Sequence, residues 1–239
     1  MGLNLVLKGK IIKIKMIIVI LMFINTVILT AESSVKYTID VVPKKMSVQE
    51  KKKRFFALFV PAIKKVYAAL EKDYLETQKL IETEPDSQKL KVLMQSYSAK
   101  NLQDLLTRMK PHPKSIALAQ SAMESAWGTS RFLRIANNVF GIWSINEDEP
   151  RVAAGKRRGD RTIYVKKYNT IEASIYDYYK LLASGKAFQK FRDEKMKTNN
   201  PTMLVKYLDK YSERGAEYGK ELASMIKYNK LTKYDNQEN

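Results

Sequence analysis

Residues 114–128 read Lys-Ser-Ile-Ala-Leu-Ala-Gln-Ser-Ala-Met-Glu-Ser-Ala-Trp-Gly, and this stretch decides the fold expected for the chain. Its apolar residues recur at helical spacing, and Gly128 supplies a stop signal. The pattern therefore predicts a buried helix from Lys114 to about Ala126. The apolar series consists of Ile116, Ala119, Met123 and Ala126.

The only acidic side chain of this predicted helix is Glu124. Gln120, Ser121 and Ala117 precede it at helical spacing, so Glu124 lies on a small, polar-edged face that suits the floor of a cleft. The negative end of the helix dipole and burial under Trp127 both raise the pKa of such a carboxyl group. A carboxylic acid that stays protonated near neutral pH is the general acid that cleaves glycosidic bonds. An ordinary surface glutamate near a helix end fits the same composition.

The composition narrows the chemistry further. The chain has 239 residues, with 43 Lys and Arg against 25 Asp and Glu, which gives a net charge of +18. This excess suggests a polyanionic partner, such as nucleic acid, a membrane surface or an acidic polymer. The absence of cysteine excludes disulfides, thiolate metal sites and Cys nucleophiles. The single histidine, His112, lies between two prolines, which argues against a Ser-His-Asp triad or a His-rich metal site. We therefore expect catalysis by carboxylates, hydroxyls, amides and aromatic rings, without a cofactor or metal.

The amino terminus has the layout of a secretory signal. Residues 1–31 contain four lysines and no acid, and an apolar run over 16–31 follows the lysines. The run is short for a membrane span of about 20 residues. Leu29 also occupies a position where cleavage after Ala31 favours a small residue. We expect export, with residues 1–31 acting as a cleaved signal peptide or a membrane anchor. Their removal leaves a net charge of about +14.

Residues 32–46 are polar and predict a linker, and a helical region follows over residues 47–110. Ser47 and Glu50 have the spacing of a capping box, which predicts a helix start at this point. Pro61 is expected to kink or split this first helix. A second helix is predicted over residues 88–108. Whether this region anchors the protein or packs on the following domain stays open.

The pattern changes after the Pro-His-Pro sequence at residues 111–113. Residues 139–145 and 162–168 resemble strands and predict a small β-hairpin, joined by a long, charged, mobile loop over 146–161. Helices then resume at Ile171 and at Asn200-Pro201, and Gly215 marks a turn before a final helix over about 217–229. Residues 232–239 form a polar tail. The fold class is therefore α+β, mostly helical.

Two motifs suggest a family. The sequence Ala-Met-Glu-Ser-Ala-Trp-Gly-Thr-Ser at residues 122–130, followed by Asn-Asn-Val-Phe-Gly-Ile at 137–142, resembles the hallmark of the bacterial β-N-acetylglucosaminidases of glycoside hydrolase family 73. Residues 168–174 and 211–218 also resemble family segments, so the resemblance runs from about 47 to 231. It implies a lysozyme-like domain over 111–231, with a small β-lobe across the cleft. It also implies Glu124 as general acid and peptidoglycan, cut after N-acetylglucosamine, as substrate.

The second catalytic group has several candidates. Glycosidases usually pair the acid with a nucleophile or a base, and a mobile loop could bring the base in with the substrate. Equally, the loop acids could balance neighbouring basic residues, or the acetamido group of the substrate could assist. Tyr168 matches a family aromatic that faces the acid, and its hydroxyl could orient water or the acetamide, or its ring could cover the core. The acids in the predicted loop are Glu147, Asp148, Glu149 and Asp160.

Substrate binding requires aromatic platforms for the C–H faces of sugars and amides for their hydroxyl and acetamido groups. Many aromatic candidates could instead pack in the core, and Asn138 could cap the turn into the hairpin. Trp143 is the preferred aromatic contact because we expect it to face outward near the loop. The candidate substrate-binding residues are Gln120, Trp127, Asn137, Asn138, Phe140, Trp143, Tyr178, Tyr211 and Tyr218.

The leading hypothesis is an exported peptidoglycan hydrolase of the glucosaminidase type, located in the periplasm or cell envelope. The alternatives are a muramidase or lytic transglycosylase, which also uses one dominant glutamate, and a peptidoglycan-binding module with weak or no activity. A nucleic-acid-binding protein is suggested by charge alone, and the export signal argues against it. The charge instead predicts adsorption to peptidoglycan and to an anionic membrane surface.

Overall fold

The computed structural model describes residues 37–158 and 161–236, which belong to one structural unit. The predicted signal or anchor segment over residues 1–31, part of the predicted linker and the candidate Asp160 lie outside the described residues. Within the described ranges, no helix is long and apolar enough to cross a membrane.

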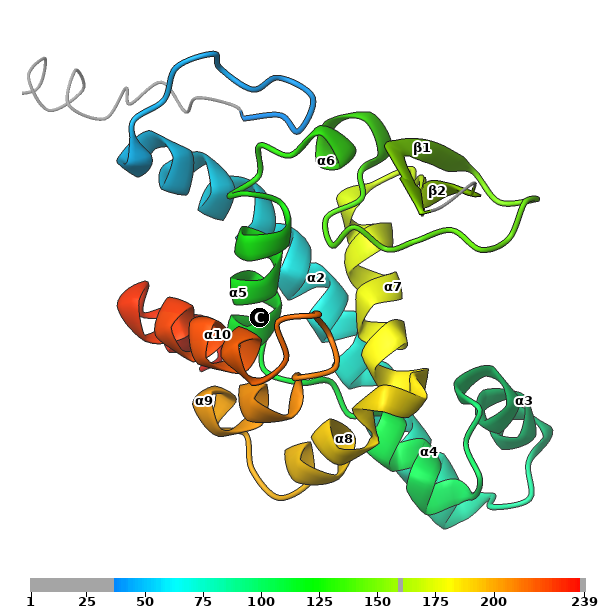
Figure 1. Ribbon diagram of the computed structural model, residues 1–239. Helices are drawn as coiled ribbons and strands as arrows, with labels where there is room; N and C mark the ends of the chain where they lie inside the picture. The colour runs from blue at the N-terminus through cyan, green and yellow to red at the C-terminus, as the bar shows by residue number, and fades with distance from the viewer. Residues whose placement is uncertain (1–36, 159–160, 237–239) are drawn as a thin grey trace, which may run out of the picture. The chain divides into compact units, whose positions relative to one another are not determined.

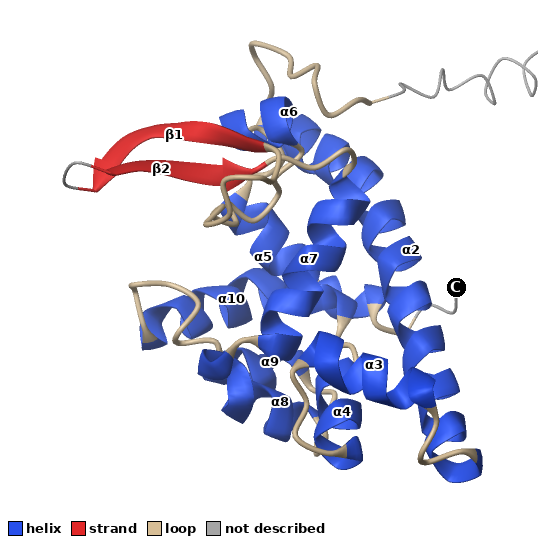
Figure 2. Cartoon of the chain, turned by 90° about the vertical axis from the view of Figure 1, so that its right-hand side faces the viewer, coloured by secondary structure: helices blue, strands red, loops and turns tan. Residues whose placement is uncertain are grey.

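Helices make up most of the fold, and β1 and β2 form a two-stranded antiparallel sheet (Figures 1 and 2). The predicted α+β, mostly helical fold with a small β-hairpin is confirmed. The α-helices are α2 (Val48–Thr83), α3 (Gln88–Tyr97), α4 (Leu102–Met109), α5 (Lys114–Glu124), α6 (Arg131–Ala136), α7 (Ile171–Ser184), α8 (Gln189–Lys195), α9 (Pro201–Leu204) and α10 (Ala216–Tyr228). The strands are β1 (Arg151–Arg158) and β2 (Arg161–Lys166), and short 3-10 turns are η1 (Lys186–Phe188), η2 (Val205–Tyr207) and η3 (Leu231–Tyr234).

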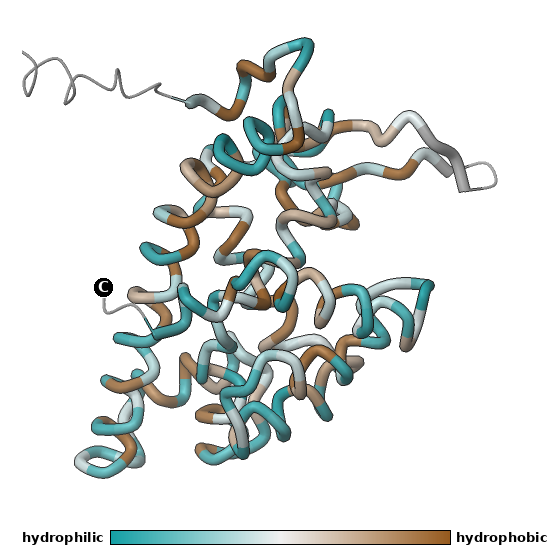
Figure 3. Tube along the Cα trace, turned by 90° about the vertical axis from the view of Figure 1, so that its left-hand side faces the viewer, coloured by the Kyte–Doolittle hydropathy of each residue, from teal (hydrophilic) through white to brown (hydrophobic). Residues whose placement is uncertain are grey.

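Helix α2 begins at the predicted capping box, where the Ser47 hydroxyl accepts from the Glu50 amide at 3.2 Å and the Glu50 carboxylate accepts from the Ser47 amide at 2.7 Å. The helix continues through Pro61, so the predicted split is wrong. Pro61 lies on the exposed face, and the opposite face is anchored by a buried stripe that includes Phe55, Phe59 and Ile63. Figure 3 shows hydrophobic and hydrophilic positions alternating along this helix. Packing of the stripe thus outweighs the backbone bond that proline removes.

The single helix predicted over residues 88–108 is divided into α3 and α4. Ser98 adopts a left-handed conformation with φ of 51° and ends α3. Asn101 then caps α4, because its side-chain oxygen accepts from the Asp104 amide at 2.8 Å. The apolar residues keep a helical spacing across this break, so the sequence pattern did not predict it. The break depends on the polar residues Ser98 and Asn101.

The main core unites the N-terminal helix with the following region. Phe55 and Phe59 of α2 belong to the same buried cluster as Ile116 of α5 and Ile175 of α7. A second, smaller cluster contains Leu90 of α3, Leu105 and Met109 of α4, and Ala183 of α7. The domain boundary at residue 111 stays a prediction, but α2 is packed on α5 and α7 rather than standing apart.

The hairpin differs from the prediction in its first strand. Residues 139–145 are not a strand, and β1 instead occupies part of the predicted loop. Val139 and Phe140 are both buried, so the segment does not alternate between two faces of a sheet. It nevertheless touches β2, because the Ser144 amide donates to the Tyr164 carbonyl at 2.9 Å and the Lys166 amide donates to the Ile142 carbonyl at 3.0 Å. The apolar run was therefore a packed loop beside the sheet.

Candidate active site

Glu124 is the last residue of α5, where the chain leaves the core. Three consecutive residues after Ser125 have positive φ: Ala126 at 51°, Trp127 at 60° and Gly128 at 76°. This reversal costs backbone energy at the two non-glycine positions. The Ser125 hydroxyl supports it by accepting from the Gly128 amide at 2.8 Å. The motif that follows Glu124 is therefore a tight turn that ends the helix at the carboxylate.

Arg54 of α2 holds this turn in place. Its buried guanidinium donates to the Gly128 carbonyl at 2.7 Å and to the Ile39 and Val41 carbonyls at 3.3 and 3.2 Å. A side chain on Gly128 would meet Phe59 at 3.3 Å and the guanidinium at 3.4 Å. Glycine is thus favoured at 128, because a side chain there would be strained at φ of 76° and would crowd Phe59 and Arg54.

A chain of hydrogen bonds leads from the core to the Glu124 carboxylate. The Tyr178 hydroxyl donates to Gln120 Oε1 at 2.6 Å, and Gln120 Nε2 donates to the Tyr218 oxygen at 2.9 Å. The Tyr218 hydroxyl then donates to Glu124 Oε1 at 2.9 Å. Gln120, Tyr178 and Tyr218 are fully buried. The chain therefore fixes the orientation of the carboxylate from inside the protein.

The electrostatic surroundings of Glu124 favour its protonated form. Partial burial raises the pKa of Glu124, and the Tyr218 hydrogen bond and the positive charge of Arg214 oppose this only in part. Arg214 lies 5.1 Å over the Tyr218 ring and is itself paired with Glu221. The carboxyl group thus has a raised pKa together with a donor and a cation that stabilise the carboxylate once its proton has left.

Stacked aromatic rings hold the tyrosines in place. Phe140 stacks on Tyr178 with ring centroids 3.9 Å apart, and Tyr211 stacks on Tyr218 at 5.5 Å. The 137–142 motif and the 211–218 segment therefore meet the same chain of tyrosines that reaches Glu124. Segments far apart in the sequence converge on one carboxyl group.

A second polar network lies on the hairpin side. The Tyr168 hydroxyl donates to Asp177 Oδ2 at 2.7 Å, and Lys166 Nζ lies 3.1 Å from the same oxygen. Lys166 also pairs with Glu149 at 3.5 Å. Burial raises the pKa of Tyr168, and the hydrogen bond that Tyr168 donates to Asp177 raises it further. Because the hydroxyl remains protonated, it can orient a neighbouring group but does not act as a base.

Sequence reasoning missed four residues of the site: Lys166, Asp177, Arg214 and Arg54. Asp177 follows Tyr176 and precedes Tyr178 on an otherwise apolar stretch of α7, and an isolated acid among aromatic residues was the available signal. Arg54 had no comparable signal, because it looked like one more basic residue of a lysine-rich helix start. Its burial among backbone carbonyls depends on the tertiary fold.

The structure places the predicted substrate-binding residues in two groups. Gln120, Asn138, Phe140, Tyr178 and Tyr218 are buried and build the site from within. Trp143 is 52% exposed, and Trp127 and Tyr211 are partly exposed, so these rings can meet a ligand.

The two asparagines predicted to bind substrate, Asn137 and Asn138, instead bond backbone groups of the protein. Asn137 donates to the Tyr168 carbonyl at 3.0 Å, and Asn138 donates to the Ile142 and Lys166 carbonyls at 3.0 and 2.9 Å. Asn138 also accepts from the Ile142 amide at 3.0 Å, which is the capping role considered for it. These two side chains thus join the turn to the hairpin.

The loop acids are not equivalent. Glu147 is 86% exposed and pairs only with Arg151, whereas Glu149 is 25% exposed and joins the Lys166 network. Asp148 is exposed, and Asp160 lies outside the described residues. Of the described candidates, Glu149 is the one connected to Tyr168 through other side chains.

Neither His112 nor a cluster of acids provides a metal site. Burial lowers the pKa of His112 to about 3, and its ring stacks on Tyr179 at 4.3 Å between centroids. Among the residues that the structure describes, no three His, Cys, Asp or Glu side chains are arranged to hold a metal ion.

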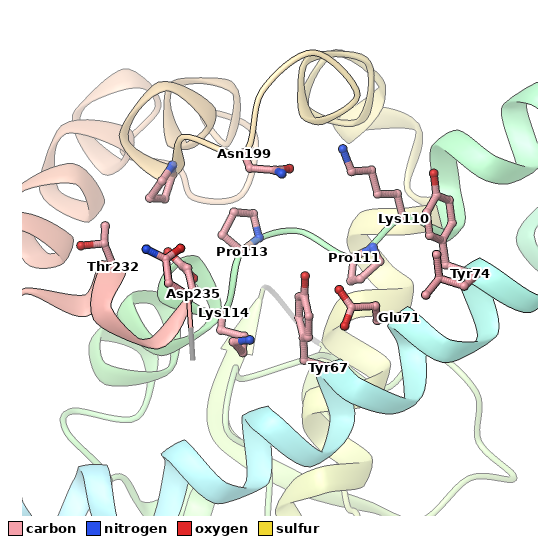
Figure 4. Close-up of a pocket in the computed structure, with 13 residues that line it drawn as sticks. Tyr67, Glu71, Tyr74, Lys110, Pro111, Pro113, Lys114, Asn199, Thr232 and Asp235 are labelled. Carbon is pink, nitrogen blue, oxygen red and sulfur yellow. The ribbon is translucent and has the colours of Figure 1, made fainter. Parts of the chain in front are cut away.

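A separate cavity of about 330 Å³ lies at the other end of α5 (Figure 4). Asp235 in its wall accepts from the Ser115 amide at 2.8 Å, and Lys114 Nζ lies 4.4 Å over the Tyr67 ring. Tyr67, Glu71 and Asp235 surround it in Figure 4, together with Lys114. These contacts secure the start of α5, and none of them includes a residue of the Glu124 networks.

Known proteins resemble this chain over its second half. One family, described as Mannosyl-glycoprotein endo-beta-N-acetylglucosaminidase, matches residues 99–231. Protein bax of Escherichia coli (strain K12) is 28% identical over 131 residues, which are 52% of this chain and 46% of that protein. Exo-glucosaminidase LytG of Bacillus subtilis (strain 168) is 33% identical over 82 residues, which are 32% of this chain and 29% of that protein. The chain thus matches less than half the length of these curated relatives.

Among solved structures, a peptidoglycan hydrolase from Sphingomonas sp. A1 aligns with a TM-score of 0.42 and 21% identity over 59% of this chain and 83% of that chain. The family match itself covers more than half of the present sequence and includes Glu124, the hairpin and the tyrosines. The resemblance drawn from the two motifs is confirmed, and the chain belongs to the glucosaminidase family of glycoside hydrolases.

Proposed function

We propose that this protein hydrolyses peptidoglycan at the β-1,4 bond after N-acetylglucosamine, with Glu124 as the general acid. The observation that carries the proposal is the setting of Glu124 at the end of α5, where burial raises the pKa of its carboxyl group. The family membership supports a glycoside hydrolase, and the name of the Sphingomonas protein supports peptidoglycan as the substrate class.

The proposed reaction begins with proton transfer from Glu124 to the oxygen of the glycosidic bond. As this bond breaks, the leaving sugar keeps the proton and the sugar on the other side gains positive charge at its ring. The new carboxylate is stabilised by the Tyr218 hydroxyl at 2.9 Å and by the charge of Arg214. The same groups that hold Glu124 in position therefore favour the product of the proton transfer.

We propose Glu149 as the base on the opposite side of the sugar, where it takes a proton from water as the water oxygen bonds to the anomeric carbon. Its Oε2 pairs with Lys166, and its buried Oε1 has no hydrogen-bond partner within the described structure. Tyr168, held by Asp177, would orient the attacking water or the acetamido group. Assistance by the acetamido group is the competing route, and it requires only Glu124 and a correctly oriented substrate.

The proposal places the protein in the cell envelope. The apolar segment over residues 1–31 would export or anchor it, and peptidoglycan carboxylates would attract its positive charge, which is +18 for the full chain and about +14 without this segment. This location and the cleavage position rest on sequence and on the family. The product of the reaction tests the cleavage position, and fractionation of cells that express the full chain tests the location.

The decisive experiment digests purified sacculi with the full chain and identifies the released fragments by mass spectrometry. Reducing-end N-acetylglucosamine supports the proposal, and Glu124→Gln should not release it. Anhydromuramic ends would assign a lytic transglycosylase, and reducing-end N-acetylmuramic acid a muramidase. Sedimentation with sacculi and no fragments would assign a binding module. Each of the last three results contradicts the proposed reaction.

A further inference from the structure

A groove of about 680 Å³ lies beside Glu124 but outside the hydrogen-bonded networks of the site. Its walls come from three elements: Lys52 of α2, Met123 and Trp127 at the end of α5, and one face of α10. Helix α5 contacts both α2 and α10 (Figure 1). The face of α10 is formed by Lys220, Glu221, Ser224, Met225 and Tyr228, followed by Asn229.

Two links place the groove next to the candidate active site. Met123 directly precedes Glu124, and Glu221 pairs with Arg214, the cation that acts on Glu124. Along α10, the groove residues run from Lys220 to Tyr228, which is about 12 Å at the rise of an α-helix. A polymer held at Glu124 can therefore extend along this face over more than one sugar ring.

The chemistry of the groove suits a sugar. Tyr228 is 80% exposed, and Trp127 is partly exposed, so two aromatic rings and two methionines offer surface for C–H faces. The hydroxyl of Ser224 lies along the same groove and can serve the polar edge of a ring. The amide of Asn229 is already bonded to Lys52 and to Met225, so it holds the wall of the groove in place. A purely apolar partner would offer no hydrogen bond to the Ser224 hydroxyl.

Two lysines line the groove, and Lys220 pairs with Glu217 at 2.6 Å, so Lys52 is the one that can give the groove its charge preference. Its ammonium lies 5.0 Å from the Trp127 ring centre and 4.9 Å from that of Tyr228, and it donates to Asn229 Oδ1 at 2.7 Å. Lys52 forms no ion pair with any acid in the part of the chain that the structure describes. A cation fixed between two aromatic rings is thus available to an anionic group on a bound sugar.

We propose that this groove binds the glycan beyond the cleaved bond and recognises a sugar that carries a carboxylate-bearing peptide. Trp127 and Tyr228 contact the rings, and Lys52 pairs with a carboxylate of the peptide. This inference rests on the proposed function for its ligand. It adds a binding site that makes the protein prefer peptide-substituted strands over uncharged strands.

The test measures binding with Glu124→Gln in every chain, so that no ligand is cleaved. Two ligands of equal length are compared: an uncharged chitooligosaccharide and a peptidoglycan fragment with its peptides. Tyr228→Ala should weaken both by about fivefold to tenfold. Lys52→Gln should weaken only the peptide-bearing fragment, by about fivefold, and should reduce the effect of salt. Lys53→Gln is the matched control, since Lys53 is exposed next to Lys52 and does not line the groove.

If both ligands bind Lys52→Gln and Tyr228→Ala with unchanged affinity, the proposal that the groove binds the glycan is wrong. Equal weakening of both ligands by Lys52→Gln would overturn the role given to the carboxylate. Lys52→Arg keeps the charge and should restore preference for the peptide-bearing fragment, and melting curves identify any variant that has not folded. The proposed function has its own test: it fails if the protein with its natural sequence releases no reducing-end N-acetylglucosamine from sacculi.

Discussion

The two ends of helix α5 each hold a partly buried carboxyl group whose pKa is raised by burial. At the first end, Asp235 accepts from the Ser115 amide at 2.8 Å, and the Lys114 charge opposes the rise of its pKa. At the second end, Glu124 accepts from the Tyr218 hydroxyl at 2.9 Å, and Arg214 opposes the rise. The two groups look alike when only their burial and pKa direction are considered.

The polarity of the helix separates their roles. Amide donors and partial positive charge gather at the start of α5, so a carboxylate there completes the helix. Pro113 provides no side-chain cap, and Asp235 supplies it from a distant segment. The end of α5 carries partial negative charge, which favours a protonated Glu124. A raised pKa therefore indicates a general acid only where the surroundings also leave the proton free to be transferred.

The largest expected effect comes from exchanging the two carboxyl groups for amides. Glu124→Gln should lower the rate of peptidoglycan cleavage by about 10²–10⁴-fold, which is the usual contribution of a general acid. Asp235→Asn should leave the rate within about twofold, because it keeps an oxygen that can accept from Ser115. Cleavage assays on labelled sacculi compare the two variants.

The different roles given to the two carboxyl groups would be contradicted if Asp235→Asn lost as much activity as Glu124→Gln while both variants remained folded. Circular dichroism and melting curves provide the control for folding. Equal activity of all three proteins would instead remove Glu124 from the reaction.

The next effect concerns the partner of Glu124 across the substrate. Glu149→Gln should lower the cleavage rate at least about tenfold more than Glu147→Gln does, because only Glu149 is joined to Lys166 and partly buried. The rate of cleavage at saturating sacculi is the measurement. Equal losses in both variants would exclude Glu149 as the second catalytic group and favour assistance by the acetamido group.

A smaller effect should follow from removing the hydroxyl that touches Glu124. Tyr218→Phe deletes a donor that favours the ionised carboxylate, so the pKa of Glu124 should rise further. Activity that needs protonated Glu124 is lost as the pH rises through this pKa, and the variant should lose it at higher pH than the natural chain. The rate should fall by about threefold to tenfold, the effect of one hydrogen bond. A pH profile of kcat/KM that shifts to lower pH would contradict this role of Tyr218.

The smallest effect lies at the start of α5 and concerns stability. Asp235→Ala removes the cap of the helix and should lower the free energy of unfolding by about 1 kcal/mol, as at other helix starts. Asp235→Asn retains an acceptor and should lose less. Urea unfolding measures both variants, and a stability of Asp235→Ala equal to that of the natural chain would show that this contact does not hold the helix.

Local signals predicted the parts of the fold that short segments determine. The capping box at Ser47 starts α2, Asn200 caps α9, and Gly215 precedes α10 as expected. The small face around Glu124 also pointed to the carboxylate at the end of α5. In each case the controlling residues lie within a few positions of the structure that they determine.

The errors lie where distant segments decide the outcome. Residues 139–145 had the composition of a strand but pack as a loop beside β2, and α2 passes through Pro61 because its other face is anchored in the core. The partners of Glu124 and Tyr168 come from α10 and α7, and a single sequence contains no spacing that pairs them. The sequence therefore named the candidate acid and, as substrate-binding residues, Gln120, Tyr178 and Tyr218, but it did not predict that they form one hydrogen-bonded chain to Glu124.

The central claim, that Glu124 donates a proton to the leaving group, is tested most directly by changing that leaving group. The rate lost through Glu124→Gln is measured on a natural glycan and on a 2,4-dinitrophenyl glycoside of the same sugar, whose leaving group needs no proton. We predict a loss of about 10²–10⁴-fold on the glycan and a loss at least about tenfold smaller on the dinitrophenyl substrate. Equal losses on the two substrates would contradict the account, because Glu124 would then act in binding or positioning and not as the acid.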